Sequence, residues 1–244
     1  MPNMATSFLQ SQRLREYANI PFEIFIVAFS ILPFFALAYF YPALPDRVPL
    51  FLNLSGEVAR WVDKGLLSVF RVPLMAVDTQ LICWLMKYGT VQSETVVPLE
   101  TVPAELRKQY VGLQLGLWDW FRCLVAFKMS AASLDTVFLS LERFKFLSRP
   151  AFAITAIAAL LSIAGALFYG YRLLVVRRQL RDKSGEVELQ KPIDARRVYG
   201  GVLYFNPSDP ALFVNKYVFN FANKWAYVFV ACIITYPLLV FSPM

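Results

Sequence analysis

Six charged side chains lie inside long apolar segments, and their types and spacing are the strongest chemical signal in this sequence. They are Arg71 and Asp78 in one segment, and Asp119, Arg122, Lys128 and Asp135 in the next. Charged groups are costly in lipid, so they usually pair with one another or line a polar path. Because the six charges sum to zero, two roles are open: ion pairs that fix helix packing, or a relay for protons or ions.

An antiparallel arrangement of the two segments would match their charges in depth. At about 1.5 Å per residue, Arg71 and Asp135 lie roughly 9 and 6 Å below the outer ends of their helices. Asp78 and Lys128 lie roughly 20 and 17 Å below those ends by the same rise. The sequence therefore predicts the ion pairs Arg71–Asp135 and Asp78–Lys128.

Asp119 and Arg122 stand at i and i+3, so they can pair within one helix. Each carboxylate of the six then has a candidate cation, which favours structural ion pairs over a relay. Glu23, at the inner end of the first apolar segment, differs because no cation lies within one helical turn of it. We expect Glu23 to meet water at the level of the lipid headgroups.

Composition removes several kinds of active site. The chain has no histidine, which excludes His-ligated haem, His-based zinc sites and Ser-His or Cys-His nucleophiles. Cys83, Cys123 and Cys232 each lie in an apolar segment without metal-ligand or redox spacing, so we expect buried thiols. The sequence predicts a non-enzymatic protein with no catalytic residue, metal site or cofactor.

The apolar residues are clustered in a way that points to a bilayer. Hydrophobic residues make up 58% of the 244 residues and charged residues 17%, against about 45–50% and 25% in soluble domains. We predict an all-α, polytopic bundle with spans at about 20–41, 65–86, 115–139, 151–174 and 225–242. The second and third spans contain the charges, so one of them could instead be an amphipathic helix on the membrane surface.

The distribution of Lys and Arg predicts the orientation of these spans. With the N-terminus inside, the inner segments hold two, three and ten such residues, and the outer loops hold three and three. This bias favours N-in and C-out in a cytoplasmic membrane. The net charge of +7 indicates contact with anionic lipid rather than nucleic acid.

Four regions follow from these boundaries. They are a two-span unit at 1–90, two further spans at 91–176, a basic cytoplasmic segment at 177–224, and a C-terminal span at 225–244. The basic segment opens with Asp182–Glu186, whose charge and glycine predict a linker.

The segment between the first two spans combines rigidity with polar side chains. Pro42, Pro45 and Pro49 fix φ and discourage helix, a turn is expected around residues 53–56, and residues 57–64 fit a short amphipathic helix. Its candidate recognition residues are Asp46, Arg47, Asn53, Ser55, Glu57, Arg60 and Trp61. A structural cap and a recognition surface are both open for this loop.

The same loop resembles a known family. The pattern Leu-Pro-Asp-Arg-Val-Pro at 44–49, with Asn53, Ser-Gly-Glu at 55–57, Arg-Trp at 60–61 and Lys64, is similar to the N-terminal domain of unknown function of SdpI-type immunity proteins. The resemblance covers about residues 20–90, with Phe51 where the family commonly has a histidine. It implies sensing of, or immunity to, an external agent.

A second motif lies in the cytoplasmic segment. Tyr204, Asn206, Asp209 and Lys216 belong to a Tyr-x-Asn-Pro-x-Asp-Pro pattern that resembles a short C-terminal domain of unknown function, here without its usual Gly-x-Gly-Trp stretch. Residues 200–205 are predicted to be extended and 206–210 to form a tight turn. Asp209, Lys216 and Lys224 could dock this segment onto headgroups.

Three functions are consistent with these patterns. The first is envelope sensing or immunity through the outer loop, and the alternative is an accessory or scaffold subunit of a larger membrane complex. A small transporter is the third, although five spans divide poorly into equal repeats. The expected partners are the lipid bilayer and other membrane subunits, and no nucleic acid.

Overall fold

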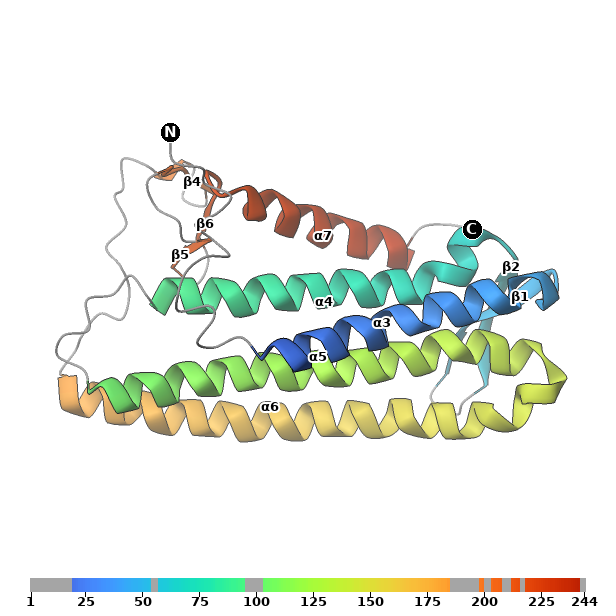
Figure 1. Cartoon of the computed structure of the whole chain (residues 1–244), viewed down its shortest axis with the longest axis horizontal. Helices are drawn as coiled ribbons and strands as arrows, with labels where there is room; N and C mark the ends of the chain where they lie inside the picture. Colours follow the sequence, from blue (N-terminus) through green and yellow to red (C-terminus); the bar gives the residue numbers. More distant parts are fainter. Residues whose placement is uncertain are drawn as a thin grey trace. The chain divides into compact units, whose positions relative to one another are not determined.

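The computed structural model describes residues 19–53, 57–94, 103–184, 198–199, 203–207, 212–215 and 218–241. Most of this part is helical (Figure 1). Its long helices are α3 (Ile20–Phe40), α4 (Leu66–Glu94), α5 (Ala104–Ser140), α6 (Ser148–Ser184) and α7 (Lys224–Phe241). All five are long and apolar enough to cross a membrane, so the five predicted spans are confirmed as helices of that kind. Many large apolar side chains on them are exposed, such as Phe35, Leu160 and Leu167.

Helices α5 and α6 are much longer than the spans predicted within them. Each has 37 residues, which is about 55 Å of helix and exceeds a hydrocarbon core of about 30 Å. Helix α6 continues through residues 182–184, so the predicted linker is wrong there. The reason is apolar packing between the ends of two helices. Val176 and Leu180 of α6 are buried against Leu106, Tyr110 and Leu113 of α5.

The chain forms two compact units, each assembled from separate pieces of sequence. One contains residues 20–81, 120–164 and 233–244, and the other contains 1–19, 82–119 and 165–232. In the second unit, Tyr88, Val111 and Leu115 form a cluster with Trp84 and Trp225. The ring centroids of the two tryptophans are 5.5 Å apart, which holds the first turn of α7 in this cluster.

The first unit contains a β-hairpin where α3 ends and α4 begins (Figure 1). The short helix η1 (Tyr41–Ala43) precedes it. Strands β1 (Arg47–Leu52) and β2 (Val58–Asp63) pair antiparallel, with Arg47 opposite Asp63 and Val48 opposite Val62. The helix predicted at residues 57–64 is therefore wrong. The Pro-rich segment before it is extended and offers a strand edge, and Val58 to Asp63 pair with that edge.

A small four-stranded sheet precedes α7 in the other unit. Its strands are β3 (Val198–Tyr199), β4 (Leu203–Tyr204), β5 (Phe213–Asn215) and β6 (Val218–Asn220), in the order β3-β4-β6-β5. Strands β4 and β6 pair parallel, whereas the other two pairs are antiparallel. The extended structure predicted for this motif is confirmed at β4. Residues 208–210 of the predicted turn lie outside the described part.

Candidate functional site

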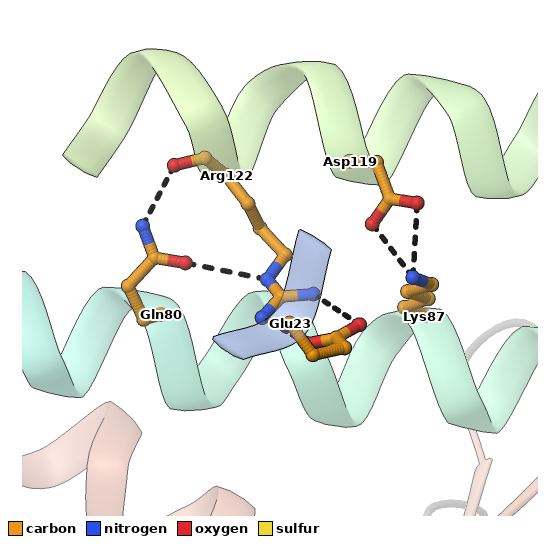
Figure 2. Close-up of polar contacts among 5 residues, drawn as sticks. All are labelled: Glu23, Gln80, Lys87, Asp119 and Arg122. Carbon is orange, nitrogen blue, oxygen red and sulfur yellow. Dashed lines mark hydrogen bonds and ion pairs between the residues drawn. The ribbon is translucent and has the colours of Figure 1, made fainter. Parts of the chain in front are cut away.

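The side chain of Arg122 connects three helices inside one unit. Its Nη1 and Nη2 donate to Glu23 Oε1 and Oε2 on α3, at 2.9 and 2.7 Å (Figure 2). The Arg122 side chain is 2% exposed and that of Glu23 is 18% exposed. Two parallel hydrogen bonds between ionised groups fix orientation as well as distance. The position of α3 against α5 is therefore specified by this contact.

Gln80 on α4 completes the environment of Arg122. Arg122 Nε donates to Gln80 Oε1 at 3.2 Å, and Gln80 Nε2 donates to the Arg122 carbonyl oxygen at 2.7 Å (Figure 2). The three guanidinium nitrogens are thus all hydrogen-bonded to protein. A buried ion pair offsets its desolvation only when its remaining donors are satisfied in this way. The arrangement suits a structural role better than binding of a mobile ion.

A second buried ion pair lies in the other unit. Lys87 Nζ on α4 donates to both carboxylate oxygens of Asp119 on α5, at 2.7 and 2.9 Å (Figure 2). The side chain of Lys87 is 2% exposed and that of Asp119 is 26% exposed. This pair was not predicted, because Lys87 is one of the three Lys and Arg residues assigned to the second inner segment. The pair fixes the register between α4 and α5.

The expectation for Glu23 was wrong. We expected it to meet headgroup water, and it is instead held by Arg122. That expectation considered only cations within one turn of the same helix. Arg122 is 99 positions away in the chain, so spacing along the first helix does not indicate it as a partner. Asp119 and Arg122 likewise each bind a residue on another helix, which the sequence did not indicate.

The two predicted pairs between α4 and α5 do not appear in the described part of the chain. Arg71 is fully buried and Asp135 is 7% exposed, in the same unit. No hydrogen bond to Asp135 Oδ1 comes from any described residue. Lys128 is exposed and Asp78 is only partly buried. Thus the structure buries Arg71 and Asp135 in one unit without joining them, and it leaves Lys128 on the surface.

The hairpin presents polar side chains from a rigid base. Val48, Leu50 and Val62 are buried against Leu37 of α3, Leu44, Val69 of α4 and Val137 of α5. The predicted recognition residues within the described part are all exposed: Asp46, Arg47, Asn53, Glu57, Arg60 and Trp61. Ser55 lies outside the described residues. In β1 the consecutive residues Val48, Pro49 and Leu50 are buried, whereas β2 buries Val62 and exposes Ala59, Arg60 and Trp61.

Hydrogen bonds close the hairpin at both ends. Asn53 N donates to the Glu57 carbonyl oxygen at 2.8 Å, and Glu57 N donates to Asn53 Oδ1 at 2.9 Å. At the base, Lys64 Nζ donates to the Leu44 carbonyl oxygen at 2.8 Å and lies 5.0 Å from the centroid of the Tyr41 ring. The loop is therefore a defined surface.

The motif that contains Tyr204 and Asn206 is organised around Asn220, which is fully buried. Its Oδ1 accepts from the backbone N–H groups of Asn206 and Ala222, at 3.0 and 3.2 Å. Its Nδ2 donates to the Asn206 carbonyl oxygen at 3.1 Å, and Asn206 Nδ2 donates to Tyr204 Oη at 2.8 Å. Tyr204 and Asn206 therefore have a structural role in joining β4 to β6.

Other residues named from the sequence add no chemistry. Asp209 and Lys216 lie outside the described residues, and Lys224 Nζ is 6.0 Å from the centroid of the Trp225 ring. Cys83 and Cys232 are buried and Cys123 is partly buried, as expected for thiols in apolar helices. Within the described ranges, no group of three or more His, Cys, Asp or Glu side chains could hold a metal ion.

Comparisons with known proteins identify one region. Residues 28–77 match a family model described as a domain of unknown function, DUF1648. The match covers about a fifth of the chain, from within α3 through the hairpin into α4, and it falls inside one compact unit. No curated protein and no solved structure matches the chain. Residues 28–77 are therefore similar to a domain of unknown function, in a chain whose long helices are suited to a membrane.

Proposed function

We propose that this chain is a non-enzymatic protein of a bacterial cytoplasmic membrane whose outer β-hairpin recognises an external agent, in sensing or in immunity. The observation that supports this most directly is the hairpin itself. Its inner side is fixed to three helices, and its strand β2 exposes both Arg60 and Trp61, the latter 44% exposed. A rigid surface with an aromatic and a cationic side chain is suited to binding, because little entropy is lost on association.

The proposed orientation places this hairpin outside the cell. Of the fifteen Lys and Arg residues assigned to inner segments, Lys87 is buried in an ion pair and no longer counts as a flanking charge. Fourteen inner cations against six outer ones still favour an inner N-terminus. The exposed arginines Arg172, Arg177 and Arg178 on α6 lie directly after an uncharged run and support the same orientation.

The buried ion pairs serve this function as scaffolding. Arg122 with Glu23 and Gln80 fixes α3, α4 and α5 relative to one another. The same three helices supply the apolar side chains under the hairpin. A recognition surface held in this way keeps its geometry whether or not an agent is bound.

Survival of cells exposed to membrane-active agents tests the proposal. Cells that lack the chain are challenged with a panel of secreted antimicrobial peptides, and growth is compared after return of the wild-type chain or of Arg60→Ala/Trp61→Ala. We expect at least one agent against which the wild-type chain protects and the double variant does not. Phe146→Ala, which removes an aromatic side chain that is 72% exposed, is the control and should protect fully.

Two results would overturn the proposal. One is full protection by the double variant at wild-type membrane levels, which would exclude the hairpin as the receiving surface. The other is the absence of any protective effect of the wild-type chain across the panel. Membrane levels are measured by immunoblot, so loss of protein is distinguished from loss of recognition.

A further inference from the structure

Lys128 is a charged side chain far from either end of a helix suited to a membrane. It lies within the candidate span Lys108–Ser140 of α5, twelve residues before the end of that helix. Twelve residues correspond to about 18 Å along the helix axis. Lys128 also lies four residues from the midpoint of the candidate span Lys108–Ser140, so its ammonium is nearer the middle of this apolar helix than either end.

The structure provides no counter-charge for Lys128 within the residues it describes. Lys87 of α4, by contrast, is 2% exposed and bonded to both oxygens of a carboxylate. Lys128 is instead exposed and forms neither a hydrogen bond nor an ion pair with the described chain. Exposed ammonium groups inside a bilayer are costly and normally mark a contact or a polar path.

The surface around Lys128 suits another helix. Residues at i−7, i−3 and i+4 share its face, and they are Phe121, Val125 and Ala132. Phe121 is 38% exposed, while Val125 and Ala132 are partly exposed. Small residues at such positions allow two helices to approach closely in lipid. We call Phe121, Val125, Lys128 and Ala132 the Lys128 face.

We propose that the Lys128 face binds a membrane-spanning helix of a different protein, which places an Asp or Glu side chain against Lys128. Charge complementarity selects this occupant, because an acidic side chain removes the cost of the exposed ammonium. The contact would make the chain a subunit of a larger membrane assembly. It is separate from recognition at the hairpin, and neither proposal depends on the other.

A second copy of the chain does not fit as well. Glu23 and Asp119 are already held by Arg122 and Lys87. Asp135 is 7% exposed and cannot reach a neighbour, and Asp78 is only partly exposed. The exposed carboxylates of the described long helices, Glu105 and Asp182, lie in the first turn of α5 and the last turn of α6, at helix ends and not beside an apolar middle segment like that of Lys128.

Photo-crosslinking in the chain's own membranes tests this proposal. The probe is benzoylphenylalanine in place of Phe121, and cross-linked products are digested and identified by mass spectrometry. We expect an adduct with an apolar peptide of another protein that contains Asp or Glu. In a Lys128→Leu background the adduct should fall at least about tenfold, while Lys128→Arg should retain it.

Two controls accompany this experiment: a probe at an exposed position on another helix, and a stability measurement of the Lys128 variant. The same reagent in place of Ile157, which is 56% exposed on α6, should give lipid adducts only. Lys128→Leu should keep the thermal unfolding midpoint of the purified chain, because Lys128 is exposed and makes no hydrogen bond or ion pair with a described residue. If Lys128→Leu fails to fold, Lys128→Gln replaces it in the same comparison.

The proposal is overturned by an adduct that is unchanged by Lys128→Leu, by an adduct with a second copy of the chain, or by adducts with lipid alone. An adduct with a peptide that contains no acidic residue would also contradict it, since charge complementarity is its basis.

Discussion

Glu23 and Arg122 are 99 positions apart in the chain and form two parallel hydrogen bonds of 2.9 and 2.7 Å. Both side chains are largely buried, so each depends on the other for charge compensation. Loss of one partner leaves an uncompensated charge, whereas loss of both leaves none. The energetic consequence is therefore strongly non-additive.

Glu23→Leu and Arg122→Met are each expected to destabilise the chain by about 3–5 kcal/mol, and the double variant by much less. The physical reason is that the double variant removes both desolvation penalties along with the attraction. Reversible unfolding in mixed detergent micelles, analysed as a double-mutant cycle, measures the coupling. Additive effects of the two substitutions would show that the ion pair is not formed. Glu142→Leu, at a residue whose side chain is 86% exposed, is the control and should change stability little.

Alanine substitutions at two glycines of α5 are expected to change the stability of the chain in opposite directions. A Cβ atom on Gly116 would lie 3.0 Å from Cε1 of Tyr169, whereas one on Gly112 would meet no atom within 4 Å. Gly112→Ala should stabilise the chain by up to about 1 kcal/mol through helix propensity. Gly116→Ala should destabilise it by about 1–2 kcal/mol, because the close approach to Tyr169 outweighs the same gain.

Thermal unfolding of the two alanine variants in one detergent tests this difference directly. In a Tyr169→Leu background the penalty at Gly116 should largely disappear. If Gly116→Ala proved as stabilising as Gly112→Ala in the original background, α6 would not approach α5 at this point.

Asn220 joins two backbone segments through one side chain, so its loss should loosen the small sheet locally. Asn220→Ala removes the acceptor for the Asn206 and Ala222 N–H groups and the donor to the Asn206 carbonyl oxygen. Each unsatisfied buried group costs about 1–3 kcal/mol. Hydrogen exchange at Asn206 and Ala222 should accelerate by at least about tenfold.

Asn223→Ala is the control for this experiment. It removes the hydrogen bond from Trp225 N to Asn223 Oδ1 at the start of α7. Its effect on exchange should be confined to the first turn of α7. Equal acceleration at Asn206 in both variants would mean that the sheet responds to any loss near α7.

The proposed orientation makes Asp63 and Lys108 accessible from opposite sides of the membrane. Both are exposed, and the side chain of Asp63 is 97% exposed. With the three native cysteines replaced by alanine, Asp63→Cys should react with an impermeant maleimide in intact cells. Lys108→Cys should react only after the membrane is permeabilised. The reverse labelling pattern would place the hairpin inside and remove it as a surface for external agents.

The long apolar runs were sufficient to predict the helices, but not their lengths. In α6 the uncharged run ends before Arg172, and the predicted span ended at about residue 174. Val176 and Leu180 continue the helix at a spacing of four residues, with Leu106 and Tyr110 at the same spacing on α5. That periodicity was present in the sequence and could have extended both helices.

Other features depended on partners that local sequence does not identify. Val58, Trp61 and Val62 stand at i, i+3 and i+4, which fits a helix as well as a strand. Pairing with β1 decided the outcome. Likewise, Glu23 pairs with Arg122 only because α3 packs on α5. The spacing of residues within one helix does not predict which helices pack together.

The way the chain alternates between its two compact units has an evolutionary consequence. The boundaries near residues 81, 119, 164 and 232 all fall inside helices, in α4, α5, α6 and α7 respectively. A crossover at any one of them would place a junction between two sequences inside a helix. Neither unit can therefore be inherited or exchanged as a single cassette. Recombination that reuses the segment matched at residues 28–77 must supply new helices to complete the unit around it.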